Sequence, residues 1–235
     1  MGKWKPILMS SAGQLRSTIP GPSKYGTPAF MAELQNVLEV SQTLTAQQKQ
    51  IADFWDDRPG TFTPAGHWVS IGTQLIKAYK TPGPRAARIL AYLGAVEYDA
   101  AVAFFEAKYQ WWSIRPITAM WRLCDGGGKL CTEAELQATP ARATYRNKWF
   151  SYIGTPSVPS YPSGHATFSG GASKLLGYFF PKAATSMAAF ARQAAKSRLY
   201  GGIHFNEDDD DGLVLGRGIA DLAIKRAGAD RAGAG

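Results

Sequence analysis

The chain has 235 residues, of which 45% are hydrophobic and 19% are charged. This balance is typical of a globular protein with one large domain or two small ones, and it excludes intrinsic disorder and fibrous repeats. The formal net charge of +8 indicates an anionic partner, which could be nucleic acid, a membrane surface or a small oxyanion.

The first third of the chain contains an irregular segment and then helical patterns. Residues 1–30 are rich in Pro, Gly and Ser, which predicts an extended arm laid over the rest of the protein. Apolar residues recur at helical spacing over residues 30–54, with an interruption after which Thr45 can cap a second helix. A loop is predicted over residues 60–66 and a helix over residues 68–79.

The longest predicted helix runs from Arg85 to about Ile114, and its apolar side chains occur on all sides, so we expect it to be central and largely buried. Alternating strand patterns are nearly absent, which predicts an all-α helical bundle. We expect one catalytic domain over residues 31–228 and a flexible tail over 229–235. Further helices are predicted over residues 132–138, 165–180, 183–200 and 212–227.

No segment of the sequence predicts a membrane span, because Pro, Gly and Ser interrupt the longest uncharged interval, between Lys148 and Lys174. The first residues have the basic start of a signal peptide but no apolar region after it, so either the chain is cytoplasmic or a leader has been removed. Cys124 and Cys131 could form a disulfide or remain free thiols, and two thiols without a nearby histidine are too few for a zinc site.

Lys108 and Arg115 form the first of three candidate motifs, at the end of the long predicted helix. Nearly two helical turns separate them, which would place both on one face about 10 Å apart along the axis, where both could bind one anion. Pro116 disfavours helical geometry at Arg115, so the helix is expected to stop or bend there. Two solvated cations on a helix face would give the same pattern.

Ser163, Gly164 and His165 form the second motif, at the start of a predicted helix. Free backbone N–H groups, a hydroxyl and the positive end of the helix dipole together favour an anion. His165 could donate a proton to a leaving oxygen or accept one from bound peroxide. The alternative is that Ser163 is only a helix cap and His165 only a surface histidine.

Arg198, His204 and Asp208 form the third motif. Gly201 and Gly202 permit a sharp turn after the helix that Arg198 ends, so His204 can return to the same pocket. Asp208 can accept a hydrogen bond from one imidazole nitrogen and leave the other as a nucleophile or metal ligand. Asp208 also belongs to an acidic run that could simply cap the last helix.

Together, Lys-x6-Arg-Pro, Pro-Ser-Gly-His and Ser-Arg-x5-His-x3-Asp match the three motifs of the superfamily of type 2 phosphatidic acid phosphatases, bacterial acid phosphatases and vanadium-dependent haloperoxidases. The chain resembles the catalytic C-terminal half of bacterial proteins in the haloperoxidase branch, also at Phe54-Trp55, over residues 64–68 and over 200–205. The resemblance implies the helical bundle of this superfamily and a periplasmic or secreted location.

The resemblance also implies roles for the motif residues. Lys108, Arg115 and Arg198 would neutralise the oxygens of vanadate or phosphate, and Ser163 and Gly164 would add hydrogen bonds.

The two motif histidines would have different roles. His204 would be the axial ligand of vanadium or the phosphorylated residue, His165 the acid–base residue, and Asp208 the group that orients His204. Asp57, with Asp56 as the alternative, would support an arginine of the pocket, whereas a third histidine, His67, is expected to be structural.

The activity implied is the oxidation of bromide or iodide by hydrogen peroxide at vanadate, with a small organic compound as acceptor. Val158 lies where haloperoxidases often have an aromatic residue or a histidine near the halide, and Phe105 lies where chloride-oxidising relatives often have a tryptophan, so chloride oxidation is not expected. An acid phosphatase with a phosphohistidine intermediate is the alternative. A third, remote alternative is a basic module that binds nucleic acid or membranes. Such a module would need its Lys and Arg residues clustered on one face, whereas here they are dispersed along the chain. Assembly into a homo-oligomer is left open.

Overall fold

The computed structural model describes residues 1–122 and 149–230. These residues form helices and no strand, which confirms the predicted all-α class. Cys124, Cys131 and the helix predicted over residues 132–138 lie outside the described residues. The helices are α1 (Pro28–Gln42), α2 (Ala46–Phe54), α3 (Thr63–Ala78), α4 (Gly83–Trp111), α5 (Pro116–Trp121), α7 (Gly164–Phe179), α8 (Ala184–Tyr200) and α9 (Asn206–Ala229), with 3-10 turns η1 (Arg16–Thr18) and η2 (Pro181–Ala183).

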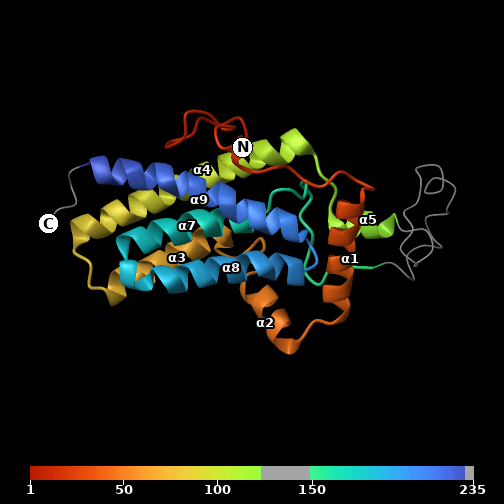
Figure 1. Cartoon of the computed structure of the whole chain (residues 1–235). Helices are drawn as coiled ribbons and strands as arrows, with labels where there is room; N and C mark the ends of the chain where they lie inside the picture. The colour runs from red at the N-terminus through yellow and green to blue at the C-terminus, as the bar shows by residue number, and fades with distance from the viewer. Residues whose placement is uncertain (123–148, 231–235) are drawn as a thin grey trace.

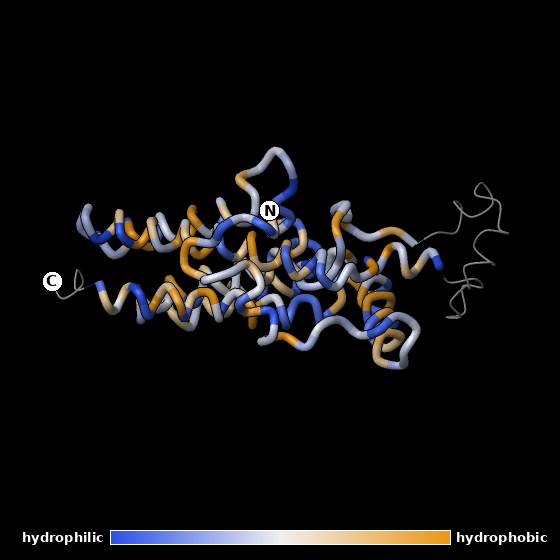
Figure 2. Tube along the Cα trace, turned by 90° about the horizontal axis from the view of Figure 1, so that it is seen from above, coloured by the Kyte–Doolittle hydropathy of each residue, from blue (hydrophilic) through white to orange (hydrophobic). Residues whose placement is uncertain are grey.

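The long helices α3, α4, α7, α8 and α9 form the body of the bundle, and α1, α2 and α5 lie towards one end of it (Figure 1). Helix α7 contacts α3, α4, α8 and α9 and is therefore the central helix. The expectation that the helix from Arg85 is central was wrong, because α4 leaves Leu90 and Tyr109 exposed on its outer side. Apolar and polar positions alternate along the long helices, as expected for helices with one buried side (Figure 2).

Close packing of α7 against α9 depends on glycine. A Cβ atom at Gly216 would lie 2.0 Å from the Thr167 carbonyl oxygen, and one at Gly170 would lie 2.5 Å from the Leu213 carbonyl oxygen. Any larger side chain would push the two backbones apart. This contact brings the N-terminal ends of α7 and α9 together, and both ends contain motif residues.

The N-terminal segment is tied to α4 by one buried carboxylate. Asp99 is fully buried and accepts hydrogen bonds from the backbone N–H groups of Ile7, Leu8 and Met9, at 2.7, 2.8 and 2.9 Å. Bonds to an ionised acceptor are among the stronger ones in proteins. The segment preceding α1 therefore has a fixed path over the bundle.

Several helix boundaries differ from the prediction. The predicted helix cap at Thr45 is present at the start of α2, where Gln48 completes a capping box. Helix α3 already begins at Thr63, because a proline is compatible with the first helical turn. Helix α9 begins at Asn206 rather than at residue 212, since acidic residues are stabilised in a first turn. In the part of the chain that the structure describes, no helix is both long enough and apolar enough to cross a membrane.

Candidate active site

The prediction that Lys108 and Arg115 lie on the same face of one helix is wrong. Helix α4 ends at Trp111, and Trp112 takes a left-handed conformation with φ of 50°. Arg115 is extended, with φ of −81° and ψ of 151°, directly before the short helix that Pro116 begins. Arg115 is therefore non-helical, as expected for a residue that precedes a proline, but the long helix has already ended four residues earlier.

The two cations nevertheless meet at one segment, residues 158–160. Lys108 Nζ donates to the carbonyl oxygens of Pro159 and Ser160, at 2.8 and 2.6 Å. Arg115 Nε donates to the carbonyl oxygen of Val158, at 2.8 Å. Because consecutive carbonyls accept from both side chains, this segment holds the two positive charges beside each other.

Arg198 approaches from the last turn of α8 and is only 1% exposed. Its Nε donates to Ser197 Oγ at 2.9 Å, and Nη2 donates to the carbonyl oxygen of Trp55. Neutral acceptors therefore hold this guanidinium in place.

Lys108, Arg115 and Arg198, which we call the cation cluster, are all buried. None of them makes an ion pair within the ranges 1–122 and 149–230. Burial lowers the pKa of Arg115 and of Arg198 to about 10, and burial together with the charge of Arg115 lowers the pKa of Lys108. Buried charges without an ionic partner are costly, so this cluster is suited to an anion.

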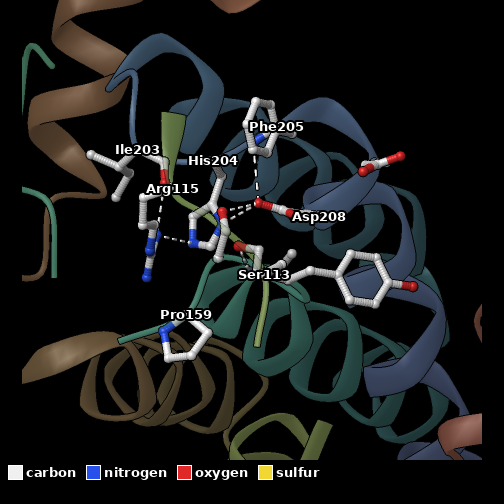
Figure 3. A network of polar contacts seen from close by, with 12 residues as sticks. Ser113, Arg115, Pro159, Ile203, His204, Phe205 and Asp208 are labelled. Carbon is white, nitrogen blue, oxygen red and sulfur yellow. Dashed lines mark hydrogen bonds and ion pairs between the residues drawn. The ribbon is translucent and has the colours of Figure 1, made fainter. Parts of the chain in front are cut away.

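His204 lies between Arg115 and Asp208 (Figure 3). Its Nδ1 is 2.8 Å from Asp208 Oδ2, which confirms the contact predicted from their spacing. The same oxygen accepts from Ser160 Oγ at 2.5 Å and from the Phe205 backbone N–H at 3.1 Å. Burial raises the pKa of Asp208 to about 7, against the opposing effects of Ser160 and the nearby cations.

The second ring nitrogen of His204, Nε2, faces the guanidinium of Arg115. Burial, followed by the charges of Arg115, Lys108 and Arg198, lowers the pKa of His204 well below its usual value, so the ring is neutral. With the proton on Nδ1 towards Asp208, Nε2 has a lone pair, and Arg115 Nη1 lies 3.0 Å from it. His204 is therefore prepared as a metal ligand or a nucleophile.

Ser163 and Gly164 lie at the start of α7, where they were predicted. Ser163 caps the helix, and its N–H donates to the Asp208 carbonyl oxygen at 2.9 Å. A Cβ atom at Gly164 would lie 3.2 Å from the Phe104 ring. The first backbone N–H groups of α7 thus lie in the neighbourhood of the His204 pair, without a side chain on Gly164 to obstruct them.

His165 contacts a carboxylate rather than only solvent. Its Nε2 lies 3.5 Å from Asp57 Oδ2, and the other Asp57 oxygen lies 3.0 Å from His67 Nδ1. Burial and the charge of Arg198 lower the pKa of His165 to about 4, although Asp57 opposes this shift. Burial alone would raise the pKa of Asp57, but His165 and His67 outweigh it and the pKa is lowered.

The predicted support of a pocket arginine by Asp57 involves no hydrogen bond in the described residues, although the charges of Asp57 and Asp56 raise the pKa of Arg198 against the effect of burial. Neither Asp57 nor Asp56 hydrogen bonds to Arg198 in the described part of the chain; Asp56 instead lies 3.7 Å from Arg58. The sequence places Asp57 and His165 more than one hundred positions apart, so no spacing rule could pair them. His67 is buried, as a structural residue would be, yet it also bonds to the carboxylate that faces His165.

Of the two predicted halide positions, Val158 lines a cavity together with Arg115, and Phe105 does not. The Phe105 ring lies against the rings of Phe104 and Tyr109, whereas Phe104 is the ring next to Gly164. Val158 contributes its carbonyl oxygen to Arg115. Sequence reasoning missed Phe104 and Ser160, because an apolar helix position and a serine in a proline-rich loop give no distinctive signal.

The residues present fit an oxyanion such as vanadate or phosphate. Two guanidinium nitrogens, Arg115 Nη2 and Arg198 Nη1, have no hydrogen bond within the described residues. Those residues also include no group of three His, Cys, Asp or Glu side chains that could hold a metal cation. Arg115 Nη1 has to shift before an anion can reach His204 Nε2.

Solved structures with this fold include two kinds of enzyme. A bacterial vanadium-dependent iodoperoxidase has a TM-score of 0.76 and 23% identity, over 94% of this chain and 55% of the other. A bacterial vanadium-dependent chloroperoxidase has a TM-score of 0.71 and 18% identity, over 95% and 53%. A transmembrane PAP2-type phosphatidylglycerolphosphate phosphatase from Bacillus subtilis has a TM-score of 0.57 and 16% identity, over 87% and 89%.

The fold and the motifs define a protein of the superfamily that contains vanadium haloperoxidases and PAP2 phosphatases. The family model described as the VCPO second helical-bundle domain matches residues 88–187 and 182–232, and the chain belongs to this family. The chain spans about half the length of the two haloperoxidases. No curated protein matches the sequence.

Proposed function

We propose that this chain is the catalytic bundle of a vanadate-dependent haloperoxidase that oxidises bromide or iodide with hydrogen peroxide. The observation that supports it is the cation cluster: three buried positive side chains without an ion pair in the described residues, next to the lone pair of a neutral histidine. The partners proposed are vanadate, halide, hydrogen peroxide and a small organic acceptor.

In this proposal the cation cluster binds the oxyanion and balances its negative charge. Lys108 and Arg198 keep their positions through backbone carbonyls, so little reorganisation is needed when the anion enters. Asp208 holds the proton of His204 on Nδ1 and directs the Nε2 lone pair at the anion. Vanadate, when bound, would supply the centre at which hydrogen peroxide is activated for transfer of an oxygen atom to halide.

His165 moves the proton in this proposal. Its pKa of about 4 makes it neutral at neutral pH, so it can accept a proton from hydrogen peroxide entering the site. An anion bound beside the ring would stabilise the imidazolium, which Asp57 also favours from the other side. The residue could then return the proton to the departing oxygen.

The second candidate function is phosphomonoester hydrolysis by the same residues. His204 Nε2 would attack phosphorus, the cation cluster would stabilise the equatorial oxygens, and His165 would protonate the leaving oxygen. The neutral, buried His204 suits a nucleophile as well as a ligand. This alternative is also supported by the fold shared with the phosphatase from Bacillus subtilis.

A paired assay on one preparation tests the proposal. Phosphomonoester hydrolysis is measured without vanadate, and halogenation with bromide or iodide is measured after addition of vanadate and peroxide. We expect vanadate-dependent halogenation. Hydrolysis that vanadate inhibits, without halogenation by either halide, would contradict the proposal and favour the phosphatase.

The Arg198→Ala variant tests whether the cation cluster binds the oxyanion. Loss of one such donor is expected to lower kcat/KM by about 10²–10³-fold and to weaken vanadate binding measured by calorimetry. Arg192→Ala is the matched control, because Arg192 is an exposed cation of the same helix. Equal activity of the two variants would argue against the site.

A further inference from the structure

A cavity of about 1080 Å³ lies beside the candidate site and ends at Arg115 and Asp208. We call it the aromatic cavity. Residues 20–25, 111–115 and 155–159 form most of its wall, with one residue of α1 and two each of α5 and α9. Its volume is at the upper end of the range for pockets that hold small organic molecules. The family match begins at residue 88, so it does not include the wall formed by residues 20–25.

Six aromatic side chains line this cavity. Trp112 is the most exposed of the large apolar residues described, at 70%, and its φ of 50° is rare for a bulky side chain. Trp112 caps the end of α4 in this left-handed conformation and contributes its exposed indole to the cavity lining. The aromatic lining residues are Tyr25, Phe30, Tyr109, Trp111, Trp112 and Phe205.

The segment that forms one wall is fixed in place. Ser23 donates to Glu207 through its N–H at 2.8 Å and through its hydroxyl at 2.6 Å. The Gly21 N–H donates to the Tyr161 hydroxyl at 3.1 Å. Gly21 has φ of 93°, and a Cβ atom there would lie 2.9 Å from the Trp111 indole nitrogen. These hydrogen bonds hold residues 21–23 in place. The close approach of the backbone to the Trp111 indole is possible because residue 21 is a glycine.

The charge inside the cavity is predominantly positive. Lys24, Arg115 and Arg122 line it without an ion pair in the described residues. The Arg122 guanidinium lies 5.7 Å from the centre of the Tyr25 ring. The two lining carboxylates, Glu207 and Asp208, already accept hydrogen bonds from serines. Cations beside aromatic faces favour a ligand whose ring is rich in electrons.

We propose that the aromatic cavity binds a phenolic compound with one or two rings, its ring against Trp112 and Tyr25 and its oxygen towards the lining cations. This inference rests on the proposed function, because it names the class of the organic acceptor. An electron-rich ring held there would react with hypohalous acid: a ring carbon gains the halogen, the ring loses a proton and water leaves.

Calorimetric titration with 2-naphthol tests the proposal on the full chain without vanadate, halide or peroxide. We expect saturable binding with one site per chain. The saturated analogue decahydro-2-naphthol, which has the same skeleton and hydroxyl without aromatic faces, is expected to bind at least about threefold more weakly.

Two substitutions locate the site. Trp112→Ala and Tyr25→Ala are each expected to weaken 2-naphthol binding by about three- to tenfold, the size of one lost aromatic contact. Both residues are exposed, so the fold should tolerate either change, and circular dichroism checks this. Trp4→Ala is the matched control, because Trp4 is an exposed aromatic residue away from the cavity lining.

The outcomes separate this inference from the proposed function. Absence of saturable binding, equal binding of the saturated analogue, or binding that neither cavity variant weakens would each overturn the inference. Failed halogenation with intact 2-naphthol binding would overturn the proposed function and leave the binding site in place.

Discussion

Two Asp–His pairs flank the cation cluster, and they differ in almost every respect. His204 and Asp208 are four residues apart and fully buried, with Asp208 also bonded to Ser160 and to the Phe205 N–H. His165 and Asp57 come from distant segments and lie 3.5 Å apart, and the His165 side chain is 18% exposed. The first pair is held by further hydrogen bonds, whereas the facing atoms of the second pair, His165 Nε2 and Asp57 Oδ2, are buried without a hydrogen bond in the described residues.

The environments give the two carboxylates opposite titration behaviour. Burial raises the pKa of Asp208 to about 7, while the two histidines beside Asp57 overcome its burial and lower its pKa. Pairs whose environments separate their pKa values are typical of sites that divide acid–base roles. This contrast supports the proposed roles, which are ligand or nucleophile for His204 and proton transfer for His165.

The largest effect should follow removal of the His204 ring. His204→Ala eliminates the Nε2 lone pair, so kcat is expected to fall by at least about 10³-fold in both assays. Thermal unfolding of the variant shows whether the fold is kept. Full activity of a folded variant in either assay would remove the mechanism that the two candidate functions share.

Asp208→Asn should have the second largest effect. The amide NH₂ can donate to Nδ1, which favours the tautomer with the proton on Nε2 and removes the lone pair from the anion side. A loss of about 10²–10⁴-fold in kcat is expected, by analogy with serine-protease triads. Asp210→Asn is the control, because Asp210 is exposed on the same helix. Similar rates for both variants would contradict tautomer control.

The same contrast explains how far the sequence could predict the site. The His204–Asp208 contact follows from a local spacing at a helix start, and it was predicted correctly. The helix dipole and cap at Ser163 are local as well. The Asp57–His165 contact and the carbonyls of residues 158–160 depend on how distant segments pack. Residue types and short spacings do not encode such long-range geometry, so the contact of Asp57 with His165 was not predicted.

Asp57→Asn should lower activity less and change its pH dependence. The carboxylate of Asp57 stabilises the charged form of His165, so its loss lowers the pKa of His165 below the present value of about 4. In the proposed function His165 acts as a neutral base, so activity rises as pH rises through that pKa. The rising limb of kcat/KM against pH is therefore expected at lower pH, and the weaker base is expected to lower the rate by about 10–10²-fold near neutral pH.

The adjacent residue provides the control for this experiment. Asp56→Asn removes a carboxylate that lies near Arg58 instead of a histidine, and its pH profile should match that of the unchanged protein. An identical profile for Asp57→Asn would show that Asp57 does not influence the titration of His165.

The smallest effect is expected at His67, which contacts His165 only through Asp57. His67→Ala removes the Nδ1 partner of Asp57 Oδ1 at 3.0 Å, so the carboxylate can rotate, and a two- to tenfold loss of kcat is expected, about 1 kcal/mol of barrier. His67→Asn retains a side-chain N–H near the Nδ1 position and should restore most of the rate. The His67 ring also lies against Trp55 and Phe62, so both variants should lose thermal stability. If His67 positions Asp57, the rate recovers in the Asn variant while the thermal stability does not. Equal rates in the Ala and Asn variants would show that His67 contributes only to packing.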